Sequence, residues 1–253
     1  MLTLPQYGLI LVAAVAGGLV NALAGGGTLI TFPVLTAVGL PSVAANMTNT
    51  VALCPGYLGG TLAQRQDLLG QARRLWWLVP ASVAGGLLGA LLLRVTSEHI
   101  FRFLVPYLIL LGTVLLALQP RLRGWLDRLA EQRGRRGSEL WSVPAVGVAT
   151  IYGGYFGAGL GVITLAVLGL SLEDSLTRLN ALKQAISLAA NVAAAVFFVF
   201  SGLVDWPAAI VMFLGSLLGG SLGGRLAGRV KPNLLRQIVI AIGLVVAAIY
   251  FIT

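Results

Sequence analysis

The amino-acid sequence predicts an all-α integral membrane protein with two inverted repeats, each with one broken or re-entrant helical hairpin followed by three transmembrane helices. Three observations lead to this fold class: an apolar composition, long apolar runs, and a similarity between the two halves of the chain. Of the 253 residues, 58% are hydrophobic and 10% are charged, whereas a soluble domain averages about 45–50% apolar and about 25% charged residues. Continuous apolar runs predict helices, because barrel strands would alternate.

The apolar runs follow one another with short connections, and the first and fifth of them are interrupted by glycine-rich stretches. The runs are 7–38, 43–63, 75–93, 101–118, 142–170, 182–203, 207–227 and 234–252. One long polar connection, the basic segment 119–140, separates the two halves of the chain. We therefore expect a single domain over 1–253, with one repeat over about 1–118 and the other over about 141–253.

The repeat is visible in paired motifs. The segment "GGLLGALLLRVTSEHIFRF" (85–103) resembles "GGSLGGRLAGRVKPNLLRQ" (219–237), with Arg-Val in the same register. Asn49 also aligns with Asn180 when single-residue slips are allowed. Glycine-rich helices can resemble each other by chance, but the shared register and the two interrupted runs favour a true repeat.

The distribution of Lys and Arg favours hairpins over simple crossings, because these residues stay on the cytoplasmic side. Eight simple crossings would place 9 of the 17 basic residues inside and 8 outside, which is no bias. If the two interrupted runs instead enter and leave on one side, only Arg94 and Arg102 remain outside. The hairpins then enter from opposite faces, and 119–140 is cytoplasmic. The leading arm of the first hairpin, about 7–23, is nearly long enough to cross, so a broken span stays open as an alternative.

The interruption "NALAGGGTLITFP" (21–33) is a poor element for a lipid-exposed helix, because glycine weakens helices and an opened backbone has no water to bond. We expect it to be a hairpin tip that meets a second tip in "GGYFGAGLG" (153–161). A helix begins at each tip, at about Thr28 and about Gly161, and helix N-termini attract anions. The predicted tip residues of the anion site are Asn21, Gly25, Gly26, Gly27, Thr28, Gly157, Gly159 and Gly161.

Polar residues on the helices that follow the tips are the remaining candidates for the site. Asn49 and Asn180 occupy matching places in the two repeats by the alignment above, and Lys183 lies one turn after Asn180. Lys183 would add a positive charge if it faced the cavity; the alternative is a side chain that reaches the cytoplasmic surface. For the asparagines, the alternative is hydrogen bonding between helices.

Several classes of function lack their motifs. The sequence has no Walker A loop, no H-E-x-x-H or G-x-S-x-G motif and no metal-binding Cys/His spacing, so we expect no enzyme activity, no metal and no cofactor. The acidic residues map to loops or span ends, and the basic segment is explained by topology rather than nucleic-acid binding. The expected partners are a small anion and the lipid bilayer; a homodimer is left open.

Broken helices in inverted repeats are typical of secondary transporters. A passive anion channel and a cation-coupled uptake carrier remain alternatives to an exporter.

Both halves also resemble a known family. The segments "GGLVNALAGGGTLITFPVLTAVGLPSVAANMTNTVA", "GGTLAQRQDL", "GGYFGAGLGVITLAVLGL" and "NALKQAISLAANVAAAVFFVFSGLVDW" are similar, in order, to those of the TauE/SafE family of sulfite exporters and toluene-sulfonate uptake permeases. The resemblance implies a transporter of sulfite, sulfoacetate or other organosulfonates in the cytoplasmic membrane of a bacterium or archaeon. It does not set the direction of transport, since the family contains both exporters and proposed uptake systems.

Overall fold

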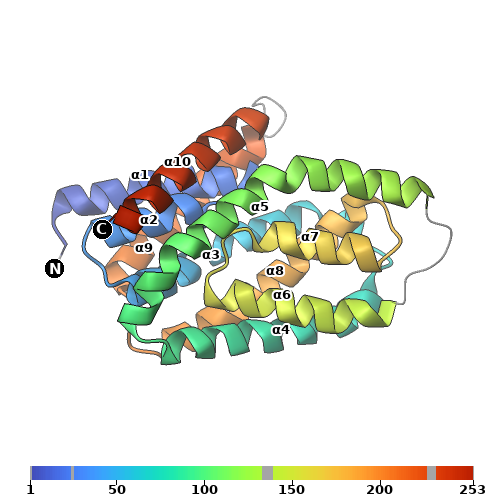
Figure 1. The fold of residues 1–253 in the computed structure, drawn as a ribbon, viewed down its shortest axis with the longest axis horizontal. Helices are drawn as coiled ribbons and strands as arrows, with labels where there is room; N and C mark the ends of the chain where they lie inside the picture. The colour runs from blue at the N-terminus through green and yellow to red at the C-terminus, as the bar shows by residue number, and fades with distance from the viewer. Residues whose placement is uncertain (1, 24–25, 133–138, 227–231, 253) are drawn as a thin grey trace.

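The computed structural model describes residues 2–23, 26–132, 139–226 and 232–252, and these residues form a helical bundle without strands (Figure 1). The first half contains a helical hairpin of α1 and α2 followed by three longer helices, and the second half has the same order. The α-helices are α1 (Leu4–Leu23), α2 (Thr28–Ala37), α3 (Ser42–Ala63), α4 (Ala72–Val95), α5 (Glu98–Gln132), α6 (Ser142–Tyr155), α7 (Leu160–Ser171), α8 (Leu176–Val199), α9 (Trp206–Leu226) and α10 (Pro232–Ile252). The all-helical prediction is confirmed, and each predicted span has its helix.

Four stretches of the described chain are long and apolar enough to cross a membrane: Leu4–Asn21, Ala72–Val95, Glu98–Leu126 and Leu176–Val199. The protein is therefore a multi-pass membrane protein. Leu4–Asn21 is most of α1, so the leading arm of the first hairpin is long enough to cross the membrane completely. The return arm α2 has 10 residues, which is about 15 Å at 1.5 Å per residue and reaches only half of a bilayer core of about 30 Å.

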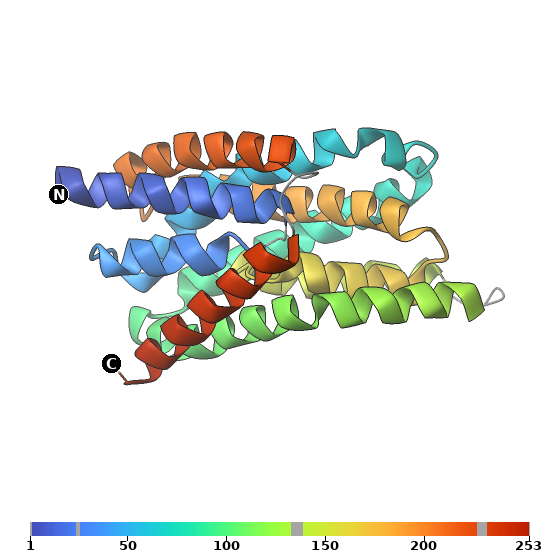
Figure 2. The same ribbon diagram turned by 90° about the horizontal axis from the view of Figure 1, so that it is seen from above.

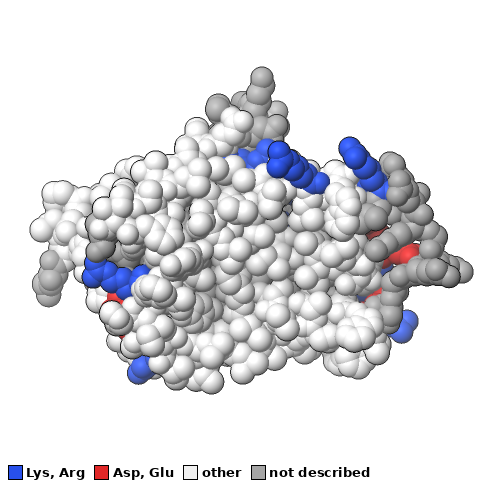
Figure 3. Space-filling model, in the orientation of Figure 1, with Lys and Arg blue, Asp and Glu red and all other residues white. Residues whose placement is uncertain are grey.

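The two hairpins enter the bundle from opposite ends of its long axis (Figures 1 and 2). α1 and α2 lie at the end that also holds the chain N-terminus, and α6 and α7 lie at the end that holds the α5–α6 connection. We call the latter the basic end, because it holds most of the described Arg residues, and the former the opposite end, which holds Arg94 and Arg102. On the face shown in Figure 3, charged side chains lie near the two ends and on the upper edge, and the broad surface between them is uncharged.

Each hairpin packs most extensively against a helix from the other half of the chain: α1 lies along α9, and α6 lies along α4. Glycines make these contacts close. A Cβ at Gly219 would overlap the carbonyl oxygen of Val15, and a Cβ at Gly89 would overlap that of Ile151. Glycines of the paired segments that begin at Gly85 and Gly219 are thus used for helix packing within the chain.

α5 corrects one feature of the sequence analysis. The apolar run ends near residue 118, and 119–140 was expected to be a separate basic loop, with an amphipathic surface helix as the alternative. Instead α5 continues as one helix of 35 residues to Gln132. Hydropathy marks where the chain leaves hydrocarbon, whereas a helix of Arg, Leu and Gln continues in water because these residues are good helix formers.

An ion-paired cluster at the basic end joins α4, α8, the connection between α7 and α8, and the residues just before α6. Arg74 of α4 donates to Asp174 at 2.6 Å and to Glu139 at 3.0 Å, and Arg178 of α8 donates to Asp174 from Nε. Asp174 also accepts the backbone N–H of Ser175. Burial raises the pKa of the Asp174 carboxyl, but these hydrogen bonds outweigh it and the pKa lies below its ordinary value of 3.8.

We expect Asp174→Asn to lower the stability of the folded protein at pH 7 by about 1–2 kcal/mol, because both guanidinium partners lose a charged acceptor. A depressed carboxyl pKa stabilises the fold above the ordinary pKa, and this contribution is lost as the pH falls through the native value. The difference in melting temperature between the variant and the unaltered protein should therefore shrink below about pH 4. Glu139→Gln is the control: Glu139 is 53% exposed, so its change should be small. A constant difference down to pH 3 would contradict the assignment.

Candidate functional site

The two hairpin tips meet at one cavity of about 180 Å³. It lies toward the basic end, because its walls include the end of α3, the later part of α5 and the first half of α8. The tips contribute residues from the end of α1, from the turn between α6 and α7, and from the starts of α2 and α7. Helices α3, α5 and α8 supply most of the remaining walls. The described lining residues are Asn21, Gly26, Gly27, Thr28, Gly56, Tyr57, Gly60, Gln64, Gln119, Arg123, Gly157, Ala158, Gly159, Leu160, Gly161, Val162, Asn180, Lys183, Gln184 and Ser187. Neither Asp nor Glu is among them.

The second tip is a turn that only glycine adopts without strain. Gly157 and Gly159 have φ of +82° and +79°, and Gly159 is the residue that precedes α7. Tyr152 donates its hydroxyl to the carbonyl of Ala158 at 2.6 Å, which fixes the turn to α6. Within the described residues, the N–H of Gly161 has no backbone acceptor, as is usual in the first turn of a helix. This tip therefore presents a helix N-terminus to the cavity.

The first tip has the same function in the fold but a different geometry. α2 begins at Thr28, as predicted, and its N-cap Gly27 lies so close to α1 that a Cβ would clash with the carbonyl of Gly17. The amide of Asn21 faces α3, where a Cβ on Gly56 would lie 3.2 Å from its Nδ2. Gly25, also predicted for the site, lies outside the described residues. α2 and α7 thus direct two helix N-termini at one space, which favours an anion.

Lys183 and Asn180 lie together on the α8 wall. Lys183 Nζ donates to Asn180 Oδ1 at 2.8 Å, and Asn180 Nδ2 donates at 2.9 Å to Oε1 of Gln64, the residue directly after α3. The Lys183 side chain lies against the second tip, since a Cβ on Gly161 would be 3.7 Å from Nζ. Lys183 therefore lies on the cavity wall, beside the second tip.

Asn49 contacts the predicted site residue Thr28 but is not itself among the described residues that line the cavity. Its side chain is buried. Its Oδ1 accepts from Thr31 Oγ1, and its Nδ2 donates to Thr28 Oγ1 at 3.4 Å. Asn49 thus holds the start of α2 against α3. Counted from the first residues of α3 and α8, Asn49 matches Lys183 and Asn180 matches Asn46, which is a different pairing from the predicted one.

Several lining residues were not predicted. Gln119 and Arg123 lie on the continuation of α5 that the sequence analysis assigned to a loop, and Arg123 adds a second cation to the cavity. Gln64, the residue directly after α3, also belongs to the lining. The helical spacing of polar residues in 46–64 and 180–191 was the available signal, since it places them on one face of each helix.

Replacing Asn180 by alanine is expected to weaken anion binding about tenfold, because Lys183 loses its acceptor and is no longer held beside the tip. The dissociation constant can be measured by the concentration dependence of thermal stabilisation in detergent. Thr177→Ala is a matched control, because Thr177 is exposed on the same helix one turn earlier. Equal affinities for both variants would contradict the role assigned to Asn180.

Multi-pass helical proteins in which broken helices meet at a polar cavity form a class, the membrane transporters, and this chain has the features of that class. It belongs to the sulfite exporter TauE/SafE family, whose model matches residues 9–250. A probable membrane transporter protein of Haemophilus influenzae is 28% identical over 230 residues, which are 90% of this chain and 88% of that protein. The probable membrane transporter protein YfcA of Escherichia coli is 26% identical over 243 residues, 95% and 88% of the two chains. No solved structure gave a significant match.

Proposed function

We propose that the protein is a secondary transporter that exports a small sulfur-containing anion, such as sulfite, sulfoacetate or another organosulfonate, by alternating access. One observation carries the proposal: two helix N-termini, Lys183 and Arg123 face a single cavity whose described lining contains no acidic residue. Oriented N–H groups and cations in a site of low dielectric constant favour an anion. The sulfonate part of the proposal rests on the family, and the anion part rests on the geometry.

The arrangement of the two halves supports alternating access. The hairpins enter from opposite ends, and the helix contacts are exchanged between the halves: α1 packs on α9 as α6 packs on α4, and α3 packs on α9 as α8 packs on α4. A two-fold relation between inverted repeats produces such an exchange. We propose this relation, with the basic end in the cytoplasm because Lys and Arg stay inside.

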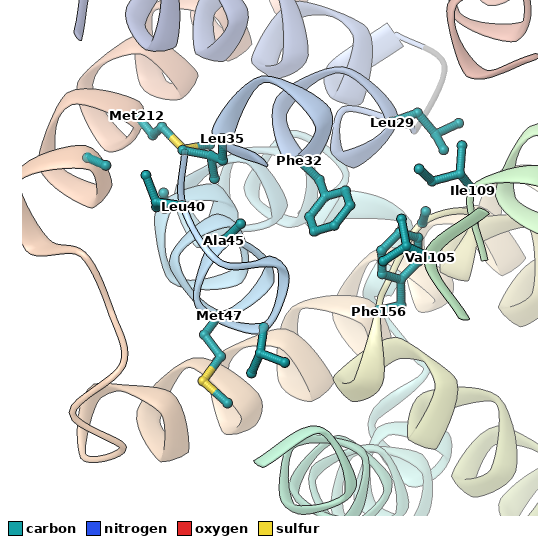
Figure 4. Packing of buried hydrophobic residues seen from close by; sticks show 14 of the residues in the cluster. Leu29, Phe32, Leu35, Leu40, Ala45, Met47, Val105, Ile109, Phe156 and Met212 are labelled. Atoms are coloured by element: carbon teal, nitrogen blue, oxygen red, sulfur yellow. The ribbon is translucent and has the colours of Figure 1, made fainter. Parts of the chain in front are cut away.

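An aromatic cluster favours a carrier over a passive channel. Phe32 of α2 lies in edge-to-face contact with Phe156 at the second tip, with ring centroids 5.3 Å apart, and both contact Phe101 of α5. All three are buried, and Figure 4 shows Phe32 pointing toward Phe156 and Val105. α2 runs from its tip to the opposite end, and α5 begins there. The cluster therefore closes the bundle between the cavity and the opposite end.

Export of an anion can be driven by the membrane potential alone. An inside-negative potential is worth about 2.3 kcal/mol per charge per 100 mV. At about 1.4 kcal/mol per tenfold, this sustains an outward gradient of about fiftyfold for a monoanion. Uptake would need a coupled cation. The described cavity lining offers no carboxylate for one, which supports export over uptake.

The proposal is tested by thermal stabilisation of the purified protein in sulfite, sulfoacetate, taurine, sulfate, chloride and acetate. A ligand at about 100 times its dissociation constant adds about 2.7 kcal/mol. We expect sulfite or sulfoacetate to raise the melting temperature, with acetate and chloride as controls. A shift common to all anions would contradict a sulfur-anion site, and no shift with any anion would contradict an anion site in this cavity.

A further inference from the structure

The polar surface between α3 and α8 continues beyond the cavity, toward the opposite end of the bundle. Past Ser187, which is the last lining residue on α8, Asn191 follows after one turn, and Asn46 and Thr50 lie on α3. All four are buried. These residues form a buried polar surface between α3 and α8.

Two atoms on this surface are buried without a hydrogen-bond partner among the described residues: Asn46 Oδ1 and Ser187 Oγ. The Asn46 side chain is 0% exposed, and its Nδ2 donates to the carbonyl of Tyr155 at 2.8 Å. An orphaned buried acceptor or hydroxyl costs about 1–3 kcal/mol. The Ser187 hydroxyl can donate to an anion, whereas Asn46 Oδ1 is an acceptor that needs a donor such as water.

Helix register gives these residues counterparts in the cavity. Counted from the first residues of α3 and α8, Asn46 matches Asn180, Asn49 matches Lys183, and Thr50 matches Gln184. The three α8 residues line the cavity that lies toward the basic end. The three α3 residues are enclosed: Asn46 is covered by the second hairpin at Tyr155, and Asn49 is covered by α2 through Thr28 and Thr31.

We propose that Asn46, Asn49 and Thr50 line the other form of the anion site, which opens at the opposite end of the bundle when the cavity at the basic end closes. The inference rests on the proposed function and adds the residues that the anion contacts on the second side. Asn46 Nδ2 and the Thr50 hydroxyl supply hydrogen-bond donors there. In this structure they are used internally, Asn46 on Tyr155 and Thr50 on the carbonyl of Asn46 at 3.0 Å.

The test uses one accessible cysteine at a time. Cys54 is the single cysteine of the chain, and Cys54→Ala gives the background. Thr50→Cys reports whether the proposed second form of the site is accessible, and Gln184→Cys reports whether the cavity is accessible. Thr113→Cys is the buried control, since Thr113 lies on α5 and packs against Gly243 of α10. A membrane-impermeant maleimide is applied to intact cells and to inside-out vesicles. Sulfoacetate uptake by proteoliposomes shows whether each protein transports.

We expect Gln184→Cys to be labelled from one face of the membrane and Thr50→Cys from the other, each at least tenfold faster than Thr113→Cys. Thr50→Cys that stays unlabelled from both faces, or is labelled from the same face as Gln184→Cys, in a protein that transports, overturns this inference alone. If Thr50→Cys does not insert, Asn46→Cys takes its place with the same expected result. Absence of sulfoacetate and sulfite transport in the unaltered chain overturns the proposed function, and this inference with it.

Discussion

Replacing Lys183 by glutamine is expected to raise the dissociation constant of the transported anion by about ten- to hundredfold. The Lys183 ammonium lies beside Gly161 at the second tip and donates to Asn180. A hydrogen bond to a charged group contributes about 1.5–3 kcal/mol, and each 1.4 kcal/mol is about a tenfold change in affinity. Glutamine preserves most of the length and the donor but removes the charge.

The measurement is the dissociation constant of the best anion from the thermal panel, by isothermal titration calorimetry in detergent. Arg121→Gln is the control, because it removes one positive charge from an exposed residue of α5 that is not among the cavity-lining residues. Lys183→Arg retains the charge and should bind more tightly than Lys183→Gln. The site assignment fails if Lys183→Gln binds the anion as tightly as Arg121→Gln.

Replacing Gly219 by leucine is expected to prevent stable folding. The backbones of α1 and α9 touch at this residue, because a Cβ on Gly219 would overlap the carbonyl oxygen of Val15 and its Cα would lie 2.9 Å away. Extra atoms in a tight contact cost about 1–3 kcal/mol where side chains can move, and here the obstacle is backbone. The whole of α1 would have to separate from α9, and the first tip would move with it.

Gly220, the next residue, is a matched control. A Cβ there meets no atom within 4 Å, and leucine is a better helix former than glycine by roughly 0.5–1 kcal/mol. Gly220→Leu should therefore express and melt like the unaltered protein, whereas Gly219→Leu should lose its monodisperse peak in size-exclusion chromatography. Equal behaviour of the two variants would show that α1 and α9 do not pack as described.

The sequence predicted the helices well because the ends of hydrophobic runs in a membrane protein depend on the residues at those ends. The starts of α2 at Thr28 and of α7 at Leu160 agree with prediction to within one residue, since glycine clusters are the only breaks inside these apolar runs. The α5 extension was missed, because charge ends a hydrophobic run without ending a helix. That error also hid Gln119 and Arg123.

The tip residues of the site were predictable, and the wall residues were only partly so. Glycines at a break indicate a tip, and two tips in a repeat indicate a meeting point. Which polar residues on α3 and α8 face that point depends on how the helices rotate and cross. Asn49 and Lys183 occupy the same register, yet Asn49 faces α2 and Lys183 faces the cavity. No pattern within one helix distinguishes these outcomes.

The close packing of α1 on α9 has a consequence for the order in which the chain assembles. The two helices are about 200 residues apart in sequence, so at a synthesis rate of about 5–20 residues per second the first helix waits roughly 10–40 seconds for its partner. During that time the face of α1 that later packs on α9 lies against lipid or the insertion machinery. A chain cut between its halves would leave both hairpins without their main supports, so neither half is expected to fold alone.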